Sequence, residues 1–297
     1  MSSGANIFDR HLLRVRQARA QLLSPATFLL DRVAADLGER LSAVLRKFDV
    51  AVDLGTPSDA VRRVLAANKN IGIVVGARSG GDEHGLRVIA DEEALPFAES
   101  SLDLVVSALA LQFINDLPGS LIQIRRALKP DGLFLAALAG GDSLTELRSA
   151  FADAESEIEG GVSPHVAPFA DVRELGGLLQ RAGFALPVVD SERLVVRYDS
   201  ALGLMHDLRH MGATNILHER RRRPLKRVML ARMTEIYGKR FSDPDGRIRA
   251  TFEIIWLSGW APHESQQKPL KPGSAAQRLA NALGTTELPA GEKPERG

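Results

Sequence analysis

The stretch Phe48-Asp49-Val50-Ala51-Val52-Asp53-Leu54-Gly55-Thr56-Pro57-Ser58-Asp59-Ala60 decides the fold of this chain. Its first half is an apolar run that ends at Gly55, and its second half leads into a helical pattern. A first strand followed by its turn into a helix has this pattern, and in open α/β sheets ligands bind near that turn. A turn that approaches a ligand closely normally needs more glycines, because only glycine lacks a Cβ atom. Residues 56–59 contain none, so the stretch predicts an α/β sheet with an unusual ligand-side turn.

Beyond this stretch, short apolar runs alternate with helical patterns. Continuous apolar runs are typical of buried parallel strands, and their alternation with helices predicts a doubly wound, mostly parallel sheet of seven strands. We expect strands at residues 50–54, 71–75, 88–90, 102–109, 133–138, 188–198 and 248–257, with a turn inside the sixth strand near 190–192. We expect helices at residues 58–67, 117–128, 143–158 and 171–182. After the second of these helices, Gly132 is expected to supply a left-handed turn.

Three segments lie outside this alternation. Residues 1–47 carry apolar positions at helical spacing and predict an N-terminal helical cap, with a break at Ser24-Pro25. A helical insertion is expected at about 201–241, before the last strand. Residues 265–297 are rich in Pro, Gly, Ala and Glu, which favours an extended or disordered tail. The sequence therefore predicts an α/β domain at 48–264 between a helical cap and a tail.

The composition is that of an ordinary globular protein. Hydrophobic residues make up 44% and charged residues 25% of the 297 residues, a balance that excludes global disorder. The sequence has no cysteine, which excludes disulfides, thiolate metal ligands and cysteine nucleophiles. No apolar run reaches the roughly 18 residues of a membrane span, and the N-terminus lacks the pattern of a secretion signal. We therefore expect a cytoplasmic protein.

The charges are nearly balanced, with a net charge of +1. The whole molecule therefore has no field that singles out nucleic acid or an anionic membrane. A basic cluster, Arg220-Arg221-Arg222-Arg223 with Lys226 and Arg227, leaves peripheral membrane contact open. No aromatic residue is interleaved with this cluster, which disfavours nucleic acid as a partner. We interpret the cluster either as a solvated helix face or as a docking patch for an acidic partner.

The strand ends suggest a site for a nucleoside-containing cofactor. Gly55 would be the point of backbone approach, although an Asp-Leu-Gly turn also occurs as an ordinary strand-to-helix turn. A dinucleotide site is disfavoured because no Gly-x-Gly-x-x-Gly pattern follows. Asp91 follows the third strand, where a carboxylate can accept a hydrogen bond from an adenine amino group, and the adjacent Glu92 is either part of this site or a solvated loop charge. The second strand ends at Gly76, without the carboxylate that usually binds ribose hydroxyls.

Polar residues after the fifth strand are the candidates for substrate chemistry. Asp142 and Glu146 are placed to receive a cationic group of a substrate through charge-assisted hydrogen bonds. Their alternative role is helix capping, with Asp142 or Ser143 as the N-cap residue. His165 and His263 lie in polar loops, where an imidazole can act as a general base or, with carboxylates, as an iron ligand. The alternative is that both only shape loops over a pocket, and because neither has the spacing of a helical metal motif, we predict no metal site.

Several motifs resemble a known family. The general ones are Val-Asp-Leu-Gly, Ala-Asp-Glu-Glu-x-Leu-Pro-Phe, Leu-Asp-Leu-Val-Val-Ser, Asn115-Asp116-Leu117-Pro118 and Leu128-Lys129-Pro130-Asp131-Gly132. They resemble class I S-adenosylmethionine-dependent methyltransferases. More specific are Asn6-Ile7-Phe8-Asp9-Arg10, Ala139-Gly140-Gly141-Asp142-Ser143-Leu144-x-Glu146-Leu147-Arg148, Glu159-Gly160-Gly161-x-Ser163-Pro164-His165 and Gly259-Trp260-x-x-His263-Glu264-Ser265-Gln266. These resemble the branch of arginine hydroxylases that assist respiratory complex I assembly and, more distantly, the biotin-pathway methyltransferases of malonyl carrier protein.

This resemblance spans about residues 6–275 and implies a function. It implies a methyltransferase-family protein that modifies a subunit of respiratory complex I during assembly, with an iron–sulfur subunit as protein partner and S-adenosylmethionine as cofactor. The cofactor contacts would then lie at Asp53, Gly55, Asp91, Glu92 and Gln112. The candidate catalytic residues are Asp142, Glu146 and His165. The alternative is a non-catalytic assembly or binding protein whose cofactor site is degenerate.

The departures from the family pattern fall at the cofactor site. The family carries Cys-Gly-x-Gly where this chain has residues 56–59, an Asp at the position of Gly76, and a His-Trp pair at Gln112-Phe113. Pro57 lacks an amide donor, and Asp59 would place a like charge near the methionyl carboxylate of the cofactor. The missing ribose carboxylate costs about 1 to 3 kcal/mol. Together these changes predict cofactor binding that is weaker by roughly two or more orders of magnitude.

Overall fold

A seven-stranded sheet with strand order β3-β2-β1-β4-β5-β7-β6 forms the centre of the protein. The computed structural model describes residues 6–80, 85–267, 281 and 284–286. The strands are β1 (Phe48–Leu54), β2 (Ile71–Arg78), β3 (Arg87–Ile89), β4 (Leu102–Ala108), β5 (Leu128–Ala139), β6 (Ala185–Tyr198) and β7 (Ile248–Trp260). Strands β1 to β5 pair in parallel, whereas β7 pairs antiparallel with both β5 and β6. The predicted doubly wound, mostly parallel sheet is thus confirmed.

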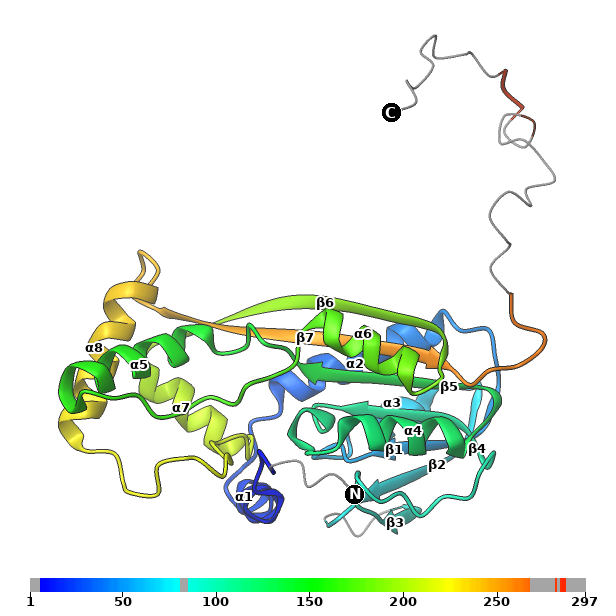
Figure 1. The fold of residues 1–297 in the computed structure, drawn as a ribbon, viewed down its shortest axis with the longest axis horizontal. Helices are drawn as coiled ribbons and strands as arrows, with labels where there is room; N and C mark the ends of the chain where they lie inside the picture. Colours follow the sequence, from blue (N-terminus) through cyan, green and yellow to red (C-terminus); the bar gives the residue numbers. More distant parts are fainter. Residues whose placement is uncertain (1–5, 81–84, 268–280, 282–283, 287–297) are drawn as a thin grey trace, which may run out of the picture. The chain divides into compact units, whose positions relative to one another are not determined.

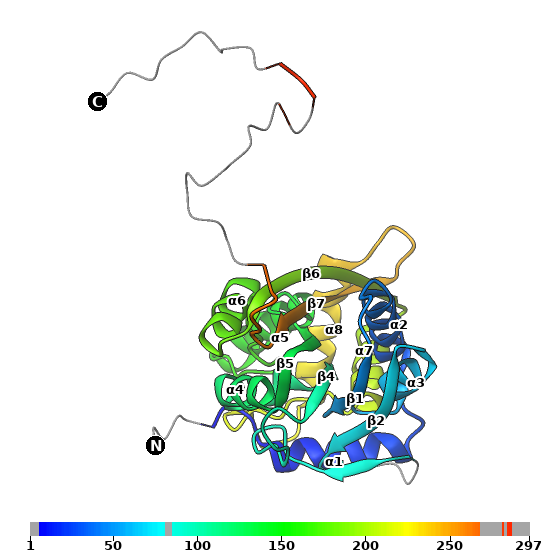
Figure 2. The same cartoon turned by 90° about the vertical axis from the view of Figure 1, so that its right-hand side faces the viewer.

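Helices cover both faces of this sheet. They are α1 (Arg10–Leu22), α2 (Phe28–Ser42), α3 (Ala60–Ala67), the 3-10 helix η1 (Leu111–Phe113), α4 (Leu117–Ala127), α5 (Thr145–Glu159), α6 (Val172–Arg181), α7 (Ala201–His210) and α8 (Arg227–Phe241). Helices α2 and α3 lie on one face, and α4 and α6 on the other (Figure 2). The long strands β6 and β7 extend towards α5, α7 and α8, which lie together (Figure 1). The predicted insertion before the last strand is therefore the pair α7 and α8.

The N-terminal cap consists of two helices, as the sequence predicts. The side chain of Asp9 caps α1 by accepting a hydrogen bond from the backbone N–H of Leu12. The break falls at the predicted Ser24-Pro25, where Ser24 has a positive φ of 59°. Contacts divide the chain into one unit at residues 1–262 and a second at 263–297, and most of the predicted tail at 265–297 lies outside the described residues. Within the described part of the chain, each helix is too short or too polar to cross a membrane.

Two local predictions are wrong. The turn expected near residues 190–192 does not interrupt β6, because Asp190 pairs with Trp256 and Glu192 with Ile254 along the ladder to β7. Since β6 is an edge strand, its polar side chains can face water without breaking the strand. The left-handed residue after α4 is Asp131, with φ 65°, and not Gly132. Glycine is needed at 132 for a different reason, since a Cβ atom there would lie 2.9 Å from the Lys129 carbonyl oxygen.

Helix α2 contributes much of the core on its face of the sheet, which leads to a first prediction. Leu37 is 0% exposed and belongs to the same buried cluster as Leu104 of β4 and Leu133 of β5. Replacing Leu37 with alanine should lower the free energy of unfolding by about 3 kcal/mol, because the packed sheet cannot collapse into the cavity. Urea unfolding measures this. Leu45→Ala is the control, because Leu45 is 97% exposed, and equal effects of the two variants would contradict the packing described.

Candidate functional site

Side chains of Thr56 and of the nearby Glu92 pack against the turn after β1 and fix its conformation. Gly55 has a positive φ of 74°, and a Cβ atom there would lie 2.8 Å from Oε1 of Glu92. The Glu92 side chain therefore already lies against the backbone that a ligand would approach. The Thr56 hydroxyl donates a hydrogen bond to Asp53 and accepts one from the backbone N–H of Ala108 at 3.2 Å. Thr56 thus ties the end of β1 to the end of β4.

Asp53 lies beneath this turn, at the end of β1. It is almost fully buried, and burial raises the pKa of its carboxyl to about 7, although the hydrogen bond from Thr56 and the nearby Arg62 charge act in the opposite direction. An aspartate with such a pKa is partly neutral at physiological pH. It is therefore a weak counter-charge for a cationic ligand.

An acidic run after β3 is neutralised by helix α1. Arg10 forms ion pairs with Asp91, Glu92 and Glu93, and its side chain is only 11% exposed. Arg14 adds a second ion pair to Asp91 at 2.6 Å. Burial raises the pKa of Asp91, but hydrogen bonds from the Glu93 N–H and from Arg10 outweigh it, so that this pKa lies below its usual value. The sequence predicted Asp91 and Glu92 at this edge of the sheet. It did not predict their partner Arg10, which occurs in the motif at residues 6–10 but had no role assigned to it.

Arginines from α3, β2 and β3 surround the end of β2, where a ribose would need a carboxylate. A Cβ atom on Gly76 would lie 3.1 Å from Cδ of Arg62, so the Arg62 side chain covers this position. A cavity of about 180 Å³ lies here, and Arg62, Arg78 and Arg87 all line it. Among the described residues of its lining, Asp53 is the one carboxylate. With Glu92 against Gly55 as well, these residues do not fit S-adenosylmethionine in the way that this fold usually holds it.

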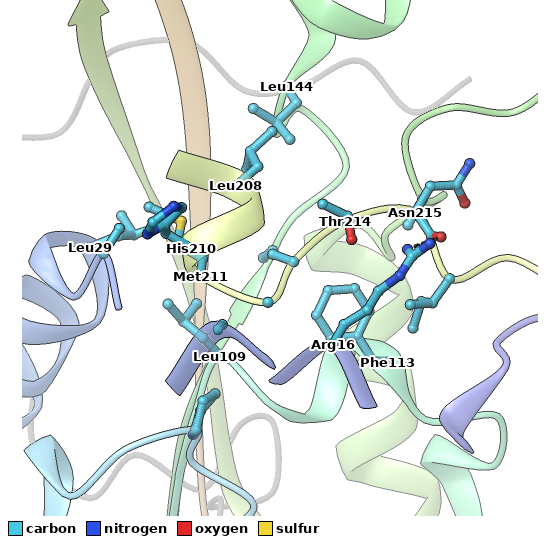
Figure 3. Close-up of a pocket in the computed structure, with 18 of the residues that line it drawn as sticks. Arg16, Leu29, Leu109, Phe113, Leu144, Leu208, His210, Met211, Thr214 and Asn215 are labelled. Atoms are coloured by element: carbon cyan, nitrogen blue, oxygen red, sulfur yellow. Dashed lines mark hydrogen bonds between the residues drawn. The ribbon is translucent and has the colours of Figure 1, made fainter. Parts of the chain in front are cut away.

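A larger pocket lies at the carboxyl ends of β4 and β5, beside Leu109 and Ala139. Its volume is about 340 Å³, and residues of α1, α2 and α7 line it. Figure 3 shows Leu109, Leu144, Leu208 and Met211 around its middle, Leu29 and His210 on one side, and Arg16, Phe113, Thr214 and Asn215 on the other. No aspartate or glutamate occurs among the described residues that line this main pocket. It therefore suits a ligand with apolar surface and a few hydrogen-bonding groups.

Arg16 connects the elements at one end of the main pocket. Its guanidinium donates a hydrogen bond to the backbone carbonyl of Asn215, and the two residues lie side by side in Figure 3. The side-chain amide of Asn215 in turn donates to the Pro164 carbonyl at 2.6 Å. Burial and the nearby Arg220 charge lower the pKa of Arg16. Helix α1, the loop after α7 and the loop before α6 thus meet at this end of the pocket.

His165 is the predicted catalytic residue that the structure places in this pocket. Its Nε2 lies 2.9 Å from Oε1 of Glu155, whose side chain is 2% exposed. Its ring stacks on Phe151, with 4.0 Å between ring centroids and 11° between planes. Glu155 also accepts hydrogen bonds from the N–H and hydroxyl of Ser163, at 2.6 and 2.7 Å. Burial raises the pKa of Glu155, but the bonds from Ser163 and His165 outweigh it and hold this pKa below its usual value.

This arrangement fixes which nitrogen of His165 can accept a proton. An ionised carboxylate only accepts hydrogen bonds, so Nε2 carries the hydrogen that meets Glu155 in the neutral imidazole. Nδ1 then holds the lone pair, and it has no hydrogen-bond partner among the described residues. Sequence reasoning did not find Glu155. The feature that could have identified Glu155 is its position one helical turn after Phe151, on the buried face of α5.

Gln112 supplies a second neutral acceptor in the same lining. Its amide nitrogen donates to the Leu109 carbonyl at 2.8 Å, which identifies the other terminal atom as oxygen. That Oε1 atom is buried and has no hydrogen-bond partner among the described residues. The residue predicted to contact a cofactor thus lines the main pocket, and its cofactor role stays a prediction.

The other predicted polar residues lie elsewhere. Asp142 is exposed and forms an ion pair with Arg193, while the buried Glu146 accepts hydrogen bonds from the N–H and hydroxyl of Thr251. Neither lines the main pocket. Neither Asp142 nor Ser143 is the N-cap residue, because the residue before α5 is Leu144, with φ 56° and no side-chain cap, but Glu146 does lie in the first turn of this helix.

The His263 ring nitrogen Nδ1 lies 2.7 Å from the Ser265 hydroxyl, a contact within the second unit. Across residues 6–80, 85–267, 281 and 284–286, no group of three or more His, Asp or Glu side chains is arranged to hold a metal ion.

Comparisons with known proteins fit this architecture. The family described as a methyltransferase domain matches residues 50–136. A structure described as a methyltransferase from Bacillus halodurans has a TM-score of 0.51 and 15% identity, and it covers 77% of this chain and 98% of its own. At that identity the likeness shows the fold alone.

The sequence relatives are closer. The mitochondrial arginine-hydroxylase NDUFAF5 of Danio rerio is 39% identical over 290 residues, which is 94% of this chain and 90% of the relative. The Homo sapiens protein of the same name is 40% identical over 91% of this chain and 81% of its own length. A malonyl-[acyl-carrier protein] O-methyltransferase of Xylella fastidiosa is 32% identical over 88% of this chain and 85% of its own length. This chain therefore belongs to the family of the arginine-hydroxylase NDUFAF5 proteins, whose fold is that of the class I methyltransferases.

Proposed function

We propose that this protein modifies an arginine of a protein partner, an iron–sulfur subunit of respiratory complex I, during assembly of that complex. The observation that carries the proposal is the extent of the likeness to the arginine hydroxylases. It covers 94% of this chain, far more than the methyltransferase domain at 50–136. The alternative of a non-catalytic binding protein is not favoured by so long a likeness to enzymes.

The main pocket gives each part of an arginine side chain a partner. The aliphatic stem would pack on the apolar walls, for example on Leu109 and Leu208. The guanidinium has five N–H donors and no acceptor. His165 Nδ1 and Gln112 Oε1 are two acceptors of the lining that have no other hydrogen-bond partner among the described residues. We infer that they receive guanidinium hydrogens, and that Glu155 keeps the His165 ring in the tautomer this requires.

S-adenosylmethionine is the cofactor that the fold suggests, and its affinity gives a second prediction. We expect binding at least roughly a hundredfold weaker than in a methyltransferase with an intact glycine turn and ribose carboxylate, because Glu92 lies against Gly55 and Arg62 covers Gly76. Isothermal titration calorimetry, with thermal shift in parallel, measures this. We expect no saturable heat at micromolar ligand. A micromolar dissociation constant would show that the acidic run and Arg62 move aside.

The partner determines where the protein works. We propose that it acts in the cytoplasm on the unassembled subunit and touches the membrane at most peripherally. After cell fractionation, the protein should be found in the supernatant. Any protein that stays with the membranes should be released by salt. Recovery in salt-washed membranes would contradict this.

Deletion of the gene in the organism that makes this protein tests the proposed function. Native gels of membranes should then show less assembled complex I, and the gene supplied in trans should restore it. Complex I at the parental level in the deletion strain would overturn the proposal.

A further inference from the structure

The main pocket shares part of its wall with a second, strongly basic cavity. This basic vestibule has a volume of about 360 Å³ and is lined by Arg16, His165, Asn215, Arg220, Arg221, Arg222, Arg223 and Leu225. Four of these residues, Arg16, His165, Asn215 and Leu225, also line the main pocket. A ligand that reaches His165 through the vestibule must therefore pass a group of guanidinium ions.

The charges of the vestibule are only partly compensated. Arg220 forms an ion pair with Asp9 at 3.3 Å, and Arg221 with Glu159. Arg222 and Arg223 are exposed and have no acidic partner in the part of the chain that the structure describes. The vestibule therefore carries an excess of positive charge.

This excess constrains what can enter. The proposed substrate side chain is itself a cation, and the main pocket offers it no carboxylate among the described residues. A guanidinium brought past Arg222 and Arg223 would be repelled, since like charges within several ångströms disfavour each other. The repulsion is offset when the partner brings its own carboxylates.

We propose that the basic vestibule binds an acidic segment of the partner protein, adjacent in sequence to the target arginine, through Arg222 and Arg223. This inference rests on the proposed function and names its substrate class as an arginine flanked by Asp or Glu. Guanidinium groups suit this role because they bind carboxylates bidentately. Together, the vestibule takes the flanking carboxylates and the main pocket takes the arginine.

A peptide fits the vestibule better than a nucleic acid does. Proteins that bind single strands stack bases on aromatic side chains along a basic groove. The described lining of the vestibule contains one aromatic ring, His165, and that ring already stacks on Phe151. A nucleotide base could stack on His165 only by displacing Phe151.

Fluorescence anisotropy with labelled short peptides tests the proposal on the full-length protein. One peptide carries a single arginine between glutamates, and a second carries it between glutamines. We expect the glutamate peptide to bind about tenfold more tightly at low salt, and this advantage to fall as salt rises. Arg222→Gln/Arg223→Gln should abolish the advantage. The matched control is Arg173→Gln/Arg181→Gln, which removes two exposed arginines of α6 that line neither cavity and should preserve it.

Three outcomes would overturn the inference. Equal affinity for the two peptides would do so, as would an equal loss in the control variant. Tighter binding of a single-stranded oligonucleotide, lost in Arg222→Gln/Arg223→Gln, would assign the vestibule to nucleic acid. The peptide assay is independent of catalysis. Tighter binding of the glutamate peptide together with normal complex I in the deletion strain would support this inference and overturn the proposed function. Equal binding of the two peptides together with less complex I in the deletion strain would overturn this inference and support the proposed function.

Discussion

Replacing His165 with glutamine is expected to slow modification of the partner's arginine by about ten- to a hundredfold, the worth of one hydrogen bond to a charged group. The glutamine amide reaches the position of Nε2 and can still donate to Glu155, but it places no acceptor where Nδ1 lies. The variant should therefore keep the hydrogen bond to Glu155 and lose the acceptor, together with the ring that stacks on Phe151. In the deletion strain, the variant is induced and the modified fraction of the arginine is followed over time by mass spectrometry.

The control for this prediction is His218→Gln. His218 is exposed and lines neither the main pocket nor the basic vestibule, so this variant should modify the arginine at the wild-type rate. An unchanged rate in His165→Gln would show that Nδ1 is not used, and the substrate would have to be placed elsewhere in the protein.

Replacing Glu155 with alanine should lower the free energy of unfolding by about 4 kcal/mol. The change leaves three partly buried donors, the Ser163 N–H, the Ser163 hydroxyl and His165 Nε2, without their buried acceptor. Each unpaired group removed from water costs about 1 to 3 kcal/mol. Guanidinium chloride unfolding measures the loss. Glu157→Ala, on the same helix but exposed and paired with Arg232, should unfold at nearly the wild-type denaturant concentration. Similar losses in both variants would contradict the buried network.

The contribution of Glu155 to the free energy of unfolding should also depend on pH. Its pKa is lower in the folded protein than in the unfolded chain, where a glutamate has a pKa of about 4.3. The stabilisation is then complete above that value and is lost as pH falls through the folded-state pKa. The difference in the free energy of unfolding between wild type and Glu155→Ala should therefore shrink as pH falls below about 4.3. A difference that grows in acid would assign the stabilisation to another group.

The fold could be predicted from sequence because its signals are local. The apolar run that ends at Gly55 and the break at Ser24-Pro25 are each decided by neighbours in the chain. The turn expected near 190–192 failed because three polar residues signal a turn and a solvent-facing edge strand equally well. Tertiary pairing with β7 decides between them.

The site was harder to predict, because its contacts join distant parts of the chain. Arg10 meets Glu92 across 82 positions, and no local pattern announces such a pair. Glu146 looked available for a substrate in sequence, yet it bonds to Thr251, 105 positions away. His165 was found as a polar residue in a loop, but its orientation depends on Glu155, which in sequence is only one of several acidic residues in α5.

The most direct test of the account is the chemical state of the partner's arginine. Complex I subunits from the parental strain and from a strain lacking this gene are digested and compared by mass spectrometry. The account predicts an arginine of an iron–sulfur subunit that carries a covalent mass increase in the parent, is unmodified in the deletion strain, and regains the modification when the wild-type gene is restored. The same modified fraction in both strains, or no modified arginine in the parent, would contradict it.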